Sequence, residues 1–163
     1  MKKLFILTLG LVFVSFAYGQ NPYEDYKFET AEDCREFAPV VRDAADWLIQ
    51  TPIDDDIYNE QNRLYTVKFI LDWMRATKDV TFDAPKWFEE MSGKNLEVSA
   101  IIFASMAKYA IDHNYDIDTA LMYETAIKDS VKYYNDNIKY LKKNKKIAKY
   151  QKLIDEDRLS EVI

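Results

Sequence analysis

The apolar stretch from Leu96 to Ile111 is the feature that most constrains how this chain can fold. Apolar side chains occupy nearly every face of a helix drawn through it, and only four positions interrupt them: Glu97, Ser99, Ser105 and Lys108. A helix that is apolar all round is enclosed by neighbours, whereas a surface helix has one polar face. With about 16 residues the stretch is also shorter than the roughly 20 that a bilayer core requires. We therefore expect a central buried helix at about 96–111.

Residues 1–19 have the form of a secretory signal peptide. Two lysines follow Met1, an apolar run extends from Leu4 to Phe16, and small residues precede the expected cleavage site after Gly19. This order of regions resembles the signals of Gram-negative bacteria. The apolar run is too short for a membrane anchor. The pattern predicts a protein exported to the periplasm or the extracellular medium, with no stable membrane insertion after cleavage.

The rest of the chain is expected to form one domain. Residues 20–29 alternate between polar and aromatic side chains without a sustained period, which indicates an extended N-terminal arm. Residues 30–163 have the apolar spacing of helices, and the whole chain contains three glycines and four prolines. The single cysteine, Cys34, permits no internal disulfide. We predict an all-α fold, a single compact bundle of five or six helices around the helix at 96–111.

Local signals predict where several helices begin and end. Thr30 and Asp33 have the spacing of a capping box, and Pro39 favours a kink or a break in the helix that follows. Asp83 is an expected N-cap for a short helix at 84–92, with Pro85 in its first turn. A helix at 57–76 is expected to bury five apolar residues, with Ile70 and Trp73 beside them: Ile57, Leu64, Val67, Leu71 and Met74.

The apolar stripe after Asp116 predicts the longest helix of the chain. It extends to Leu141 and is expected to pack antiparallel to the central helix. The stripe loses its phase near Asn144, so a break and one last short helix should follow.

No catalytic motif can be assigned. His113 is the only histidine and has no His or Cys partner at a metal-binding spacing. The chain contains neither a Gly-rich phosphate loop nor a Gly-x-Ser-x-Gly element. Carboxylates are numerous, but their spacing selects no acid-base pair. We expect no cofactor and no metal, and the sequence leans away from an enzyme.

The turn from Asp112 to Asp118 resembles the start of an EF-hand calcium loop because oxygen-bearing residues alternate along it. Ile117 occupies the position that needs glycine, and Tyr123 occupies the position of the bidentate glutamate. We interpret the turn as a helix C-cap at Asn114 followed by an N-cap at Asp116.

Charge is distributed unevenly along the chain. Twelve acidic residues and three basic ones lie between Asn21 and Glu60. A basic run with two tyrosines lies near the C-terminus: Lys139, Tyr140, Lys142, Lys143, Lys145, Lys146, Lys149 and Tyr150. In one interpretation the two regions are solvated faces that pair loosely, each exposed pair contributing under about 1 kcal/mol. In the other, the basic run is an interaction surface for an anionic partner.

These observations favour a small exported protein that acts as a binding module in the bacterial cell envelope. Its partner would be another envelope protein or an anionic envelope polymer. The net charge is −6, or −8 without Lys2 and Lys3, which disfavours nucleic acid and anionic membranes as general partners. Three alternatives remain open: a periplasmic inhibitor or immunity-type protein, a carboxylate-dependent hydrolase of envelope polysaccharide, and a ligand carrier with a pocket lined by Trp47, Trp73 and Trp87. The sequence does not indicate an oligomeric state.

Overall fold

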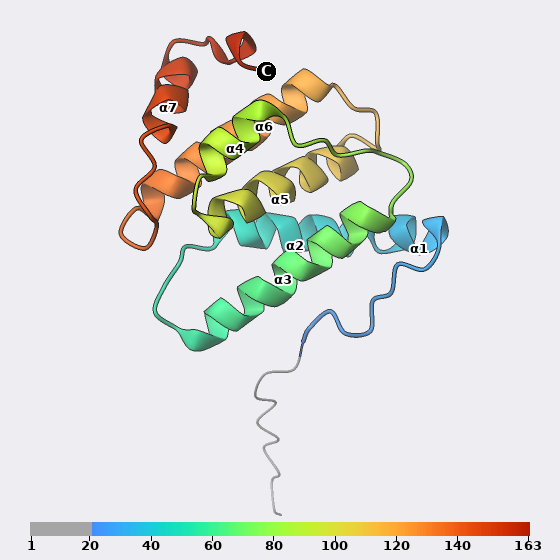
Figure 1. The fold of residues 1–163 in the computed structure, drawn as a ribbon. Coiled ribbons are helices and arrows are strands. Elements are labelled where there is room, and N and C mark those ends of the chain that lie inside the picture. The colour runs from blue at the N-terminus through green and yellow to red at the C-terminus, as the bar shows by residue number, and fades with distance from the viewer. Residues whose placement is uncertain (1–20) are drawn as a thin grey trace, which may run out of the picture.

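The computed structural model describes residues 21–163, so the expected signal peptide at 1–19 lies outside the described part of the chain. Residues 21–163 contain seven α-helices, one short 3₁₀ helix and no strand (Figure 1). The elements are α1 (Ala31–Glu36), α2 (Ala38–Gln50), α3 (Ile57–Ala76), α4 (Lys86–Ser92), α5 (Leu96–Asp112), α6 (Thr119–Asp136), α7 (Ile147–Asp155) and η1 (Leu159–Glu161). The all-α class is confirmed, with one α-helix more than expected because residues 31–50 form two helices.

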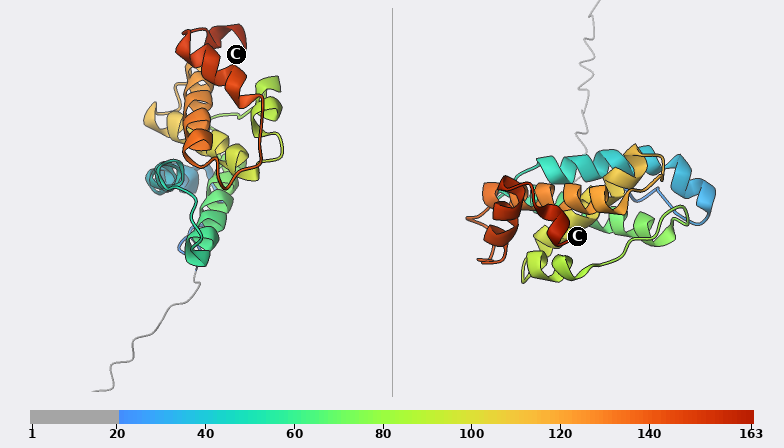
Figure 2. Two further views of the ribbon diagram at one scale, coloured as in Figure 1. Left: turned by 90° about the vertical axis from the view of Figure 1, so that its left-hand side faces the viewer. Right: turned by 90° about the horizontal axis from the view of Figure 1, so that it is seen from above.

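Helix α5 is the central helix that the sequence predicts. It packs against α6 and α2 over most of its length and also contacts α4 and α3 (Figures 1 and 2). Ile101, Ile102 and Met106 are completely buried, and Phe103 is half-buried. Leu96, in the first turn, is 85% exposed. The enclosed part of the helix therefore begins at about Val98.

Opposite faces of α5 contribute to two groups of buried side chains. The α6-side cluster joins Val98, Ile102, Met106 and Tyr109 of α5 to side chains from α4, α6 and α7, including Trp87, Met122, Ile127 and Tyr150. The α2-side cluster joins Ala100, Ile101, Ala104 and Ala107 of α5 to side chains from α2 and α3, including Val41, Ala45, Leu48, Ile70 and Trp73. Alanines on both α2 and α5 let these two helices approach closely. Helix α5 thus connects the two halves of the core.

The start of the domain follows its sequence signals. The Thr30 hydroxyl accepts a hydrogen bond from the Asp33 amide at 3.1 Å, and the Asp33 carboxylate accepts from the Thr30 amide, which completes the capping box. Helix α1 ends at Glu36, and Pro39 lies in the first turn of α2, where its missing N–H leaves no helical bond unmade. The predicted break at Pro39 is confirmed.

The predicted inward face of α3 is wrong at its first turns. Ile57 is 70% exposed and Leu64 is 63% exposed. Arg63 and Thr66 are buried instead, followed along the same face by residues such as Trp73. The apolar pattern predicts a different face because it places the polar Arg63 and Thr66 side chains toward solvent. Both side chains instead have hydrogen-bond partners inside the protein.

The helix expected at 117–141 is shorter than predicted. It begins after Asp118, whose carboxylate accepts a hydrogen bond from the Leu121 amide at 3.1 Å, and it ends at Asp136. The buried Asn137 side chain donates to the Tyr133 carbonyl and accepts from the Ile53 amide, so it fixes the helix end to the α2–α3 connection. With 18 residues, α6 is shorter than the 20-residue α3.

The short helix α4 also differs from its prediction at one end. It begins at Lys86 with Pro85 as its N-cap residue, so Asp83 does not cap it. It ends at Gly93, as expected, and the φ of +55° at Gly93 places this residue in the left-handed region that favours glycine.

The arm at 21–29 lies against α3 and the start of α2 through its aromatic rings. The Tyr23 ring stacks on Phe69 with ring centroids 4.3 Å apart, and Phe28 lies 5.3 Å from the same ring. Tyr26 meets Phe37 edge-on at 5.1 Å. These contacts extend the α2-side cluster to the first described residues. Among residues 21–163, no helix combines the length and apolar character needed to cross a membrane.

Candidate functional site

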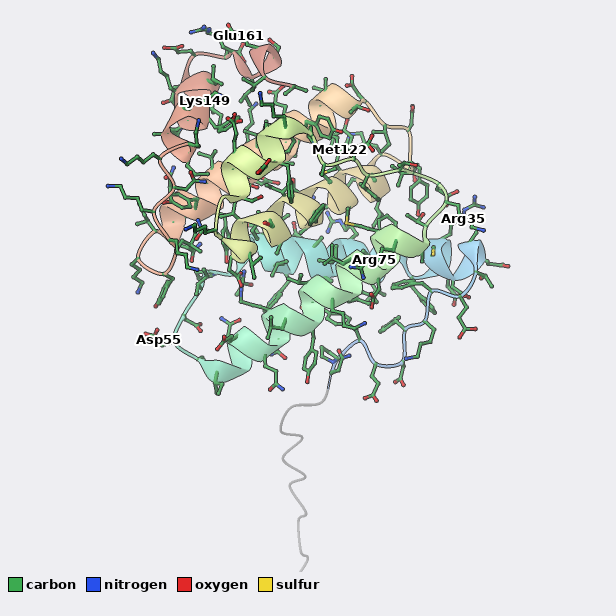
Figure 3. All side chains as sticks on the ribbon, in the orientation of Figure 1. Arg35, Asp55, Arg75, Met122, Lys149 and Glu161 are labelled. Atoms are coloured by element: carbon green, nitrogen blue, oxygen red, sulfur yellow. The ribbon has the colours of Figure 1, made fainter. Side chains whose placement is uncertain are left out.

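The basic residues predicted as an interaction surface lie together on one loop. We call residues 137–149 the basic loop; it connects α6 to α7 and includes the first residues of α7. Its lysine side chains are exposed: Lys139, Lys142, Lys143, Lys145, Lys146 and Lys149. Figure 3 shows Lys149 at the side of the molecule opposite Arg35. Tyr140 is half-buried and Tyr150 is only 1% exposed, so the Tyr150 ring belongs to the core.

Two asparagine side chains fix the course of the basic loop. Asn95, at the start of α5, accepts from the Lys142 amide at 2.7 Å and donates to the Lys142 carbonyl at 2.9 Å. Asn144 donates to the carbonyls of Glu90 and Met91, at 3.0 and 2.7 Å, and accepts from the Lys146 amide at 2.9 Å. These bonds join the two side chains to backbone groups of the loop and of α4, so they hold the loop's shape without occupying the lysine ammonium groups.

The lysines at the two ends of the basic loop have local contacts. Lys149 forms an ion pair with Glu90 at 3.0 Å, and Tyr150 donates to the same carboxylate at 2.9 Å. Hydrogen bonds from Lys149 and Tyr150 lower the pKa of Glu90. Lys139 lies 4.3 Å from the centre of the Tyr140 ring. Within residues 21–163, no hydrogen bond or ion pair involves the ammonium groups of Lys142, Lys143 and Lys145, which leaves these three groups available to a partner.

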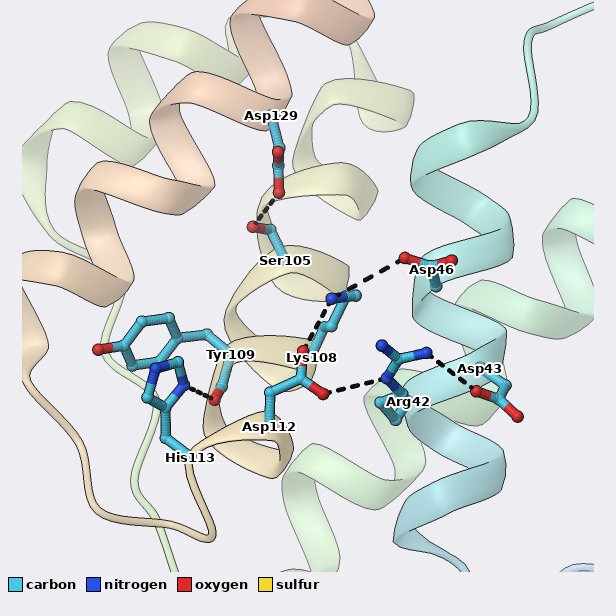
Figure 4. A network of polar contacts seen from close by, with 9 residues as sticks. All are labelled: Arg42, Asp43, Asp46, Ser105, Lys108, Tyr109, Asp112, His113 and Asp129. Carbon is cyan, nitrogen blue, oxygen red and sulfur yellow. Dashed lines mark hydrogen bonds and ion pairs between the residues drawn. The ribbon is translucent and has the colours of Figure 1, made fainter.

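A second candidate site was not predicted from the sequence. A cleft of about 410 Å³ lies over α5, between α2 and α6 (Figure 4). Its walls combine charged, hydroxyl-bearing and apolar side chains: Asp46, Ile49, Gln50, Ser105, Lys108, Tyr109, Asp112, His113, Leu121, Thr125 and Asp129. Asp46 comes from α2 and Asp129 from α6, while Ser105 and Lys108 of α5 lie between them (Figure 4).

Asp129 forms part of the α6 wall of this cleft. It is half-buried, and its carboxylate accepts a hydrogen bond from the Ser105 hydroxyl at 2.6 Å. Burial raises the pKa of Asp129, and the negative charge of Asp46 acts in the same direction, while the Ser105 bond and the charge of Lys108 oppose the rise. The carboxyl group thus takes up a proton more readily than an ordinary aspartate.

Lys108 connects the acids on the other side of the cleft. Its ammonium group lies 2.8 Å from Asp112 and 3.9 Å from Asp46. Arg42 of α2 donates to Asp112 at 3.0 Å and to Asp43 at 3.2 Å. Although burial alone raises the pKa of Asp112, the bonds from Lys108 and Arg42 lower it below its ordinary value. Asp112 and Asp129 therefore have pKa shifts of opposite sign.

His113 lies at the edge of the cleft and has a local partner. Its Nδ1 lies 2.8 Å from the Tyr109 carbonyl oxygen, and its ring stacks on the Tyr109 ring at 3.9 Å. The Ser105 hydroxyl is bonded to Asp129. These pairings do not form the nucleophile, base and acid chain of a histidine-based triad.

The turn from Asp112 to Asp118 does not gather its carboxylates around one point. Asp112 pairs with Lys108 and Arg42, and Asp118 caps α6. The left-handed residues are Asn114 and Tyr115, and the helix C-cap is His113. The predicted caps at Asn114 and Asp116 are therefore each displaced, to His113 and Asp118. Among residues 21–163, no group of three or more His, Cys, Asp or Glu side chains is arranged to hold a metal ion.

None of the comparisons with known proteins identifies a relative of this chain. No protein-family model matches the chain, and no curated protein or solved structure is significantly similar to it.

The sequence did contain one signal for the cleft. Ser105, Lys108 and Asp112 are three and four residues apart, so they fall on one face of α5. Taken singly, Ser105 and Lys108 are only interruptions of an apolar helix. Read together, they indicate a polar stripe on a buried helix, which requires polar partners or a solvent-filled cleft beside it.

Proposed function

We propose that this protein is an exported binding module that holds an anionic polymer of the cell envelope through the basic loop. The observation that supports this most strongly is the loop itself, in which exposed lysines stand on a backbone fixed by Asn95 and Asn144. A fixed loop loses little conformational entropy when it binds, and closely spaced ammonium groups attract a polyanion strongly at low salt. The signal-like residues 1–19 support export.

Binding to a defined polyanion tests this proposal. We expect the protein to be retained on immobilised heparin at 50 mM salt and released as the salt concentration rises, because the attraction is screened. A triple variant, Lys142→Gln, Lys143→Gln and Lys145→Gln, should elute at clearly lower salt. These side chains have no hydrogen bond or ion pair within residues 21–163, so the fold should be unaffected.

The matched control removes the same charge elsewhere. The variant Lys27→Gln, Lys68→Gln and Lys78→Gln changes lysines of the arm, of α3 and of the segment after α3, all outside the basic loop. It should elute close to the wild type. Equal weakening by both triple variants would attribute retention to net charge and reject the basic loop as the binding surface.

A second candidate function, a polysaccharide hydrolase, is favoured by the cleft. Carboxylates from α2 and α6 line its two walls, and the raised pKa of Asp129 has the direction that a general acid requires. Release of reducing ends from cell-wall polysaccharide, abolished by both Asp129→Asn and Asp46→Asn, would support this function. No release, or release that persists in both variants, would reject it.

A further inference from the structure

We infer that the cleft between α2, α5 and α6 binds a small organic monocation, a protonated amine next to a short apolar group. This inference goes beyond polyanion binding, because the cleft lies away from the basic loop and selects the opposite charge, and it gives the cleft a ligand class that the hydrolase candidate does not. Its volume of about 410 Å³ is within the range of small-molecule sites.

The first argument is the balance of charge inside the cleft. Three aspartates line it, and Lys108 is the one lysine or arginine among its lining residues. Asp112 is neutralised by Lys108 and Arg42 together. Within residues 21–163, Asp46 pairs with Lys108 at the longer distance of 3.9 Å, and the Asp129 carboxylate has a single hydrogen bond, from Ser105. Three aspartates thus share two cations, Lys108 and Arg42, which leaves one negative charge for a ligand to balance.

The second argument is the position of these two carboxylates. Asp46 and Asp129 belong to different helices on either side of α5, and the charge of Asp46 disfavours ionisation of Asp129 (Figure 4). A ligand cation beside Asp129 offsets this repulsion and supplies the charged partner that water gives to an exposed carboxylate. A half-buried carboxylate forms stronger hydrogen bonds with a charged donor than an exposed one does.

The third argument is the apolar part of the cleft. Leu121 is 51% exposed at its edge, and Ile49 and the Tyr109 ring line it as well. An exposed leucine beside a carboxylate suits a ligand with an apolar group next to its cation. A metal ion fits less well, because no three acidic, histidine or cysteine side chains within residues 21–163 are placed to coordinate one.

A pair of probes that differ in charge tests this inference. In an NMR titration of ¹⁵N-labelled protein at pH 7, phenethylamine should shift the amide signals of Ser105, Leu121 and Asp129, while neutral phenethyl alcohol should bind at least about tenfold more weakly. The pKa of the Asp129 carboxyl group, followed by carbon NMR, should fall when phenethylamine is bound.

Two variants locate the binding. Asp129→Asn should weaken phenethylamine binding at least about tenfold, since it removes the anionic partner but keeps an acceptor for Ser105. Asp136→Asn, on the same helix and paired with Lys132 outside the cleft, should leave binding unchanged. Equal affinity for amine and alcohol, unchanged affinity in Asp129→Asn, or absence of shifts at the cleft residues would each overturn the inference. None of these results depends on retention by heparin.

Discussion

At the scale of single residues, buried polar side chains determine how the helices meet. Arg63 of α3 is 3% exposed, donates to Glu97 of α5 at 2.8 Å and to the Thr51 carbonyl at 3.0 Å, and also bonds the Tyr133 hydroxyl of α6. Its guanidinium lies 5.4 Å from the centre of the Tyr133 ring. One side chain thus connects three helices and the end of α2, and its loss would leave several buried groups without partners.

Replacing Arg63 should therefore be costly. We expect Arg63→Leu to lower the free energy of unfolding by about 3 kcal/mol, because Thr51, Tyr133 and the partly buried Glu97 lose a charged donor. Urea denaturation measures this change. Arg75→Leu is the control, since the Arg75 side chain is 74% exposed and its pair with Asp72 should contribute under about 1 kcal/mol. Equal effects of the two substitutions would show that the Arg63 contacts contribute little to stability.

The effect of Asp129 on stability should depend on pH with the opposite sign from that of the carboxyl groups whose pKa is lowered. Its pKa is raised in the folded protein, so between about pH 4 and that raised pKa the native state binds more protons than the unfolded state. Stability from this group falls as the pH rises through that window, and the cost persists at neutral pH. Asp33, Asp79 and Glu90 have lowered pKa values and lose their contribution as the pH falls.

The substitution Asp129→Asn should consequently stabilise the protein at pH 7. The increase in urea midpoint relative to the wild type should shrink as the pH falls below about 3, where Asp129 is mostly protonated in both states. Asp136→Asn, at an exposed position, supplies the reference. A decrease in stability at pH 7 would mean that the charged form of Asp129 is favoured in the fold.

At the scale of elements, apolar period and capping chemistry predicted most of the helices. Helix α5 could be predicted because its apolar residues exceed what one face can hold, and α1 because Thr30 and Asp33 satisfy its first amides locally. The end of α6 could not be predicted, because it depends on a hydrogen bond between the Asn137 side chain and the Ile53 amide, 84 residues away. The cleft likewise combines side chains from three helices whose packing no local pattern encodes. The lysine-rich composition of the basic loop could be predicted from the sequence, but the hydrogen bonds that fix its backbone could not.

Asn95 should control the shape of the basic loop without being part of its charge. In Asn95→Ala, the Lys142 amide loses its acceptor, so its hydrogen exchange should become at least about tenfold faster. Asn135→Ala is the control, because the Asn135 side chain donates to the Gln151 side chain and not to the loop backbone. An unchanged exchange rate at Lys142 would mean that other contacts, such as those of Asn144, are sufficient to hold the loop.

At the scale of the whole molecule, α5 couples the two halves of the core. Ile70 of α3 belongs to the α2-side cluster and Ile127 of α6 to the α6-side cluster, and neighbouring residues of α5 face each of them. Because α5 contributes buried side chains to both clusters, unfolding of either half exposes apolar residues of α5, and we expect a single cooperative unfolding transition.

Methyl NMR signals can test this coupling. The signals of Ile70 and Ile127 should lose intensity at the same urea concentration in the wild type. In Ile102→Ala, which removes buried volume from the α6-side cluster only, both midpoints should decrease together, by an amount corresponding to about 2–4 kcal/mol. Different midpoints for the two isoleucines would establish two independently folding parts.

The hydrogen bonds that hold the basic loop do not involve the lysine side chains that it exposes. Its course depends on Asn95, Asn144 and Tyr134, which bond backbone groups, and not on the side chains that the loop displays. Substitutions at positions 142, 143 and 145 should therefore change the charge of this surface while the scaffold beneath stays intact. If polyanion binding is the function, as we propose, these three residues would be enough to change the partner, in evolution or by design.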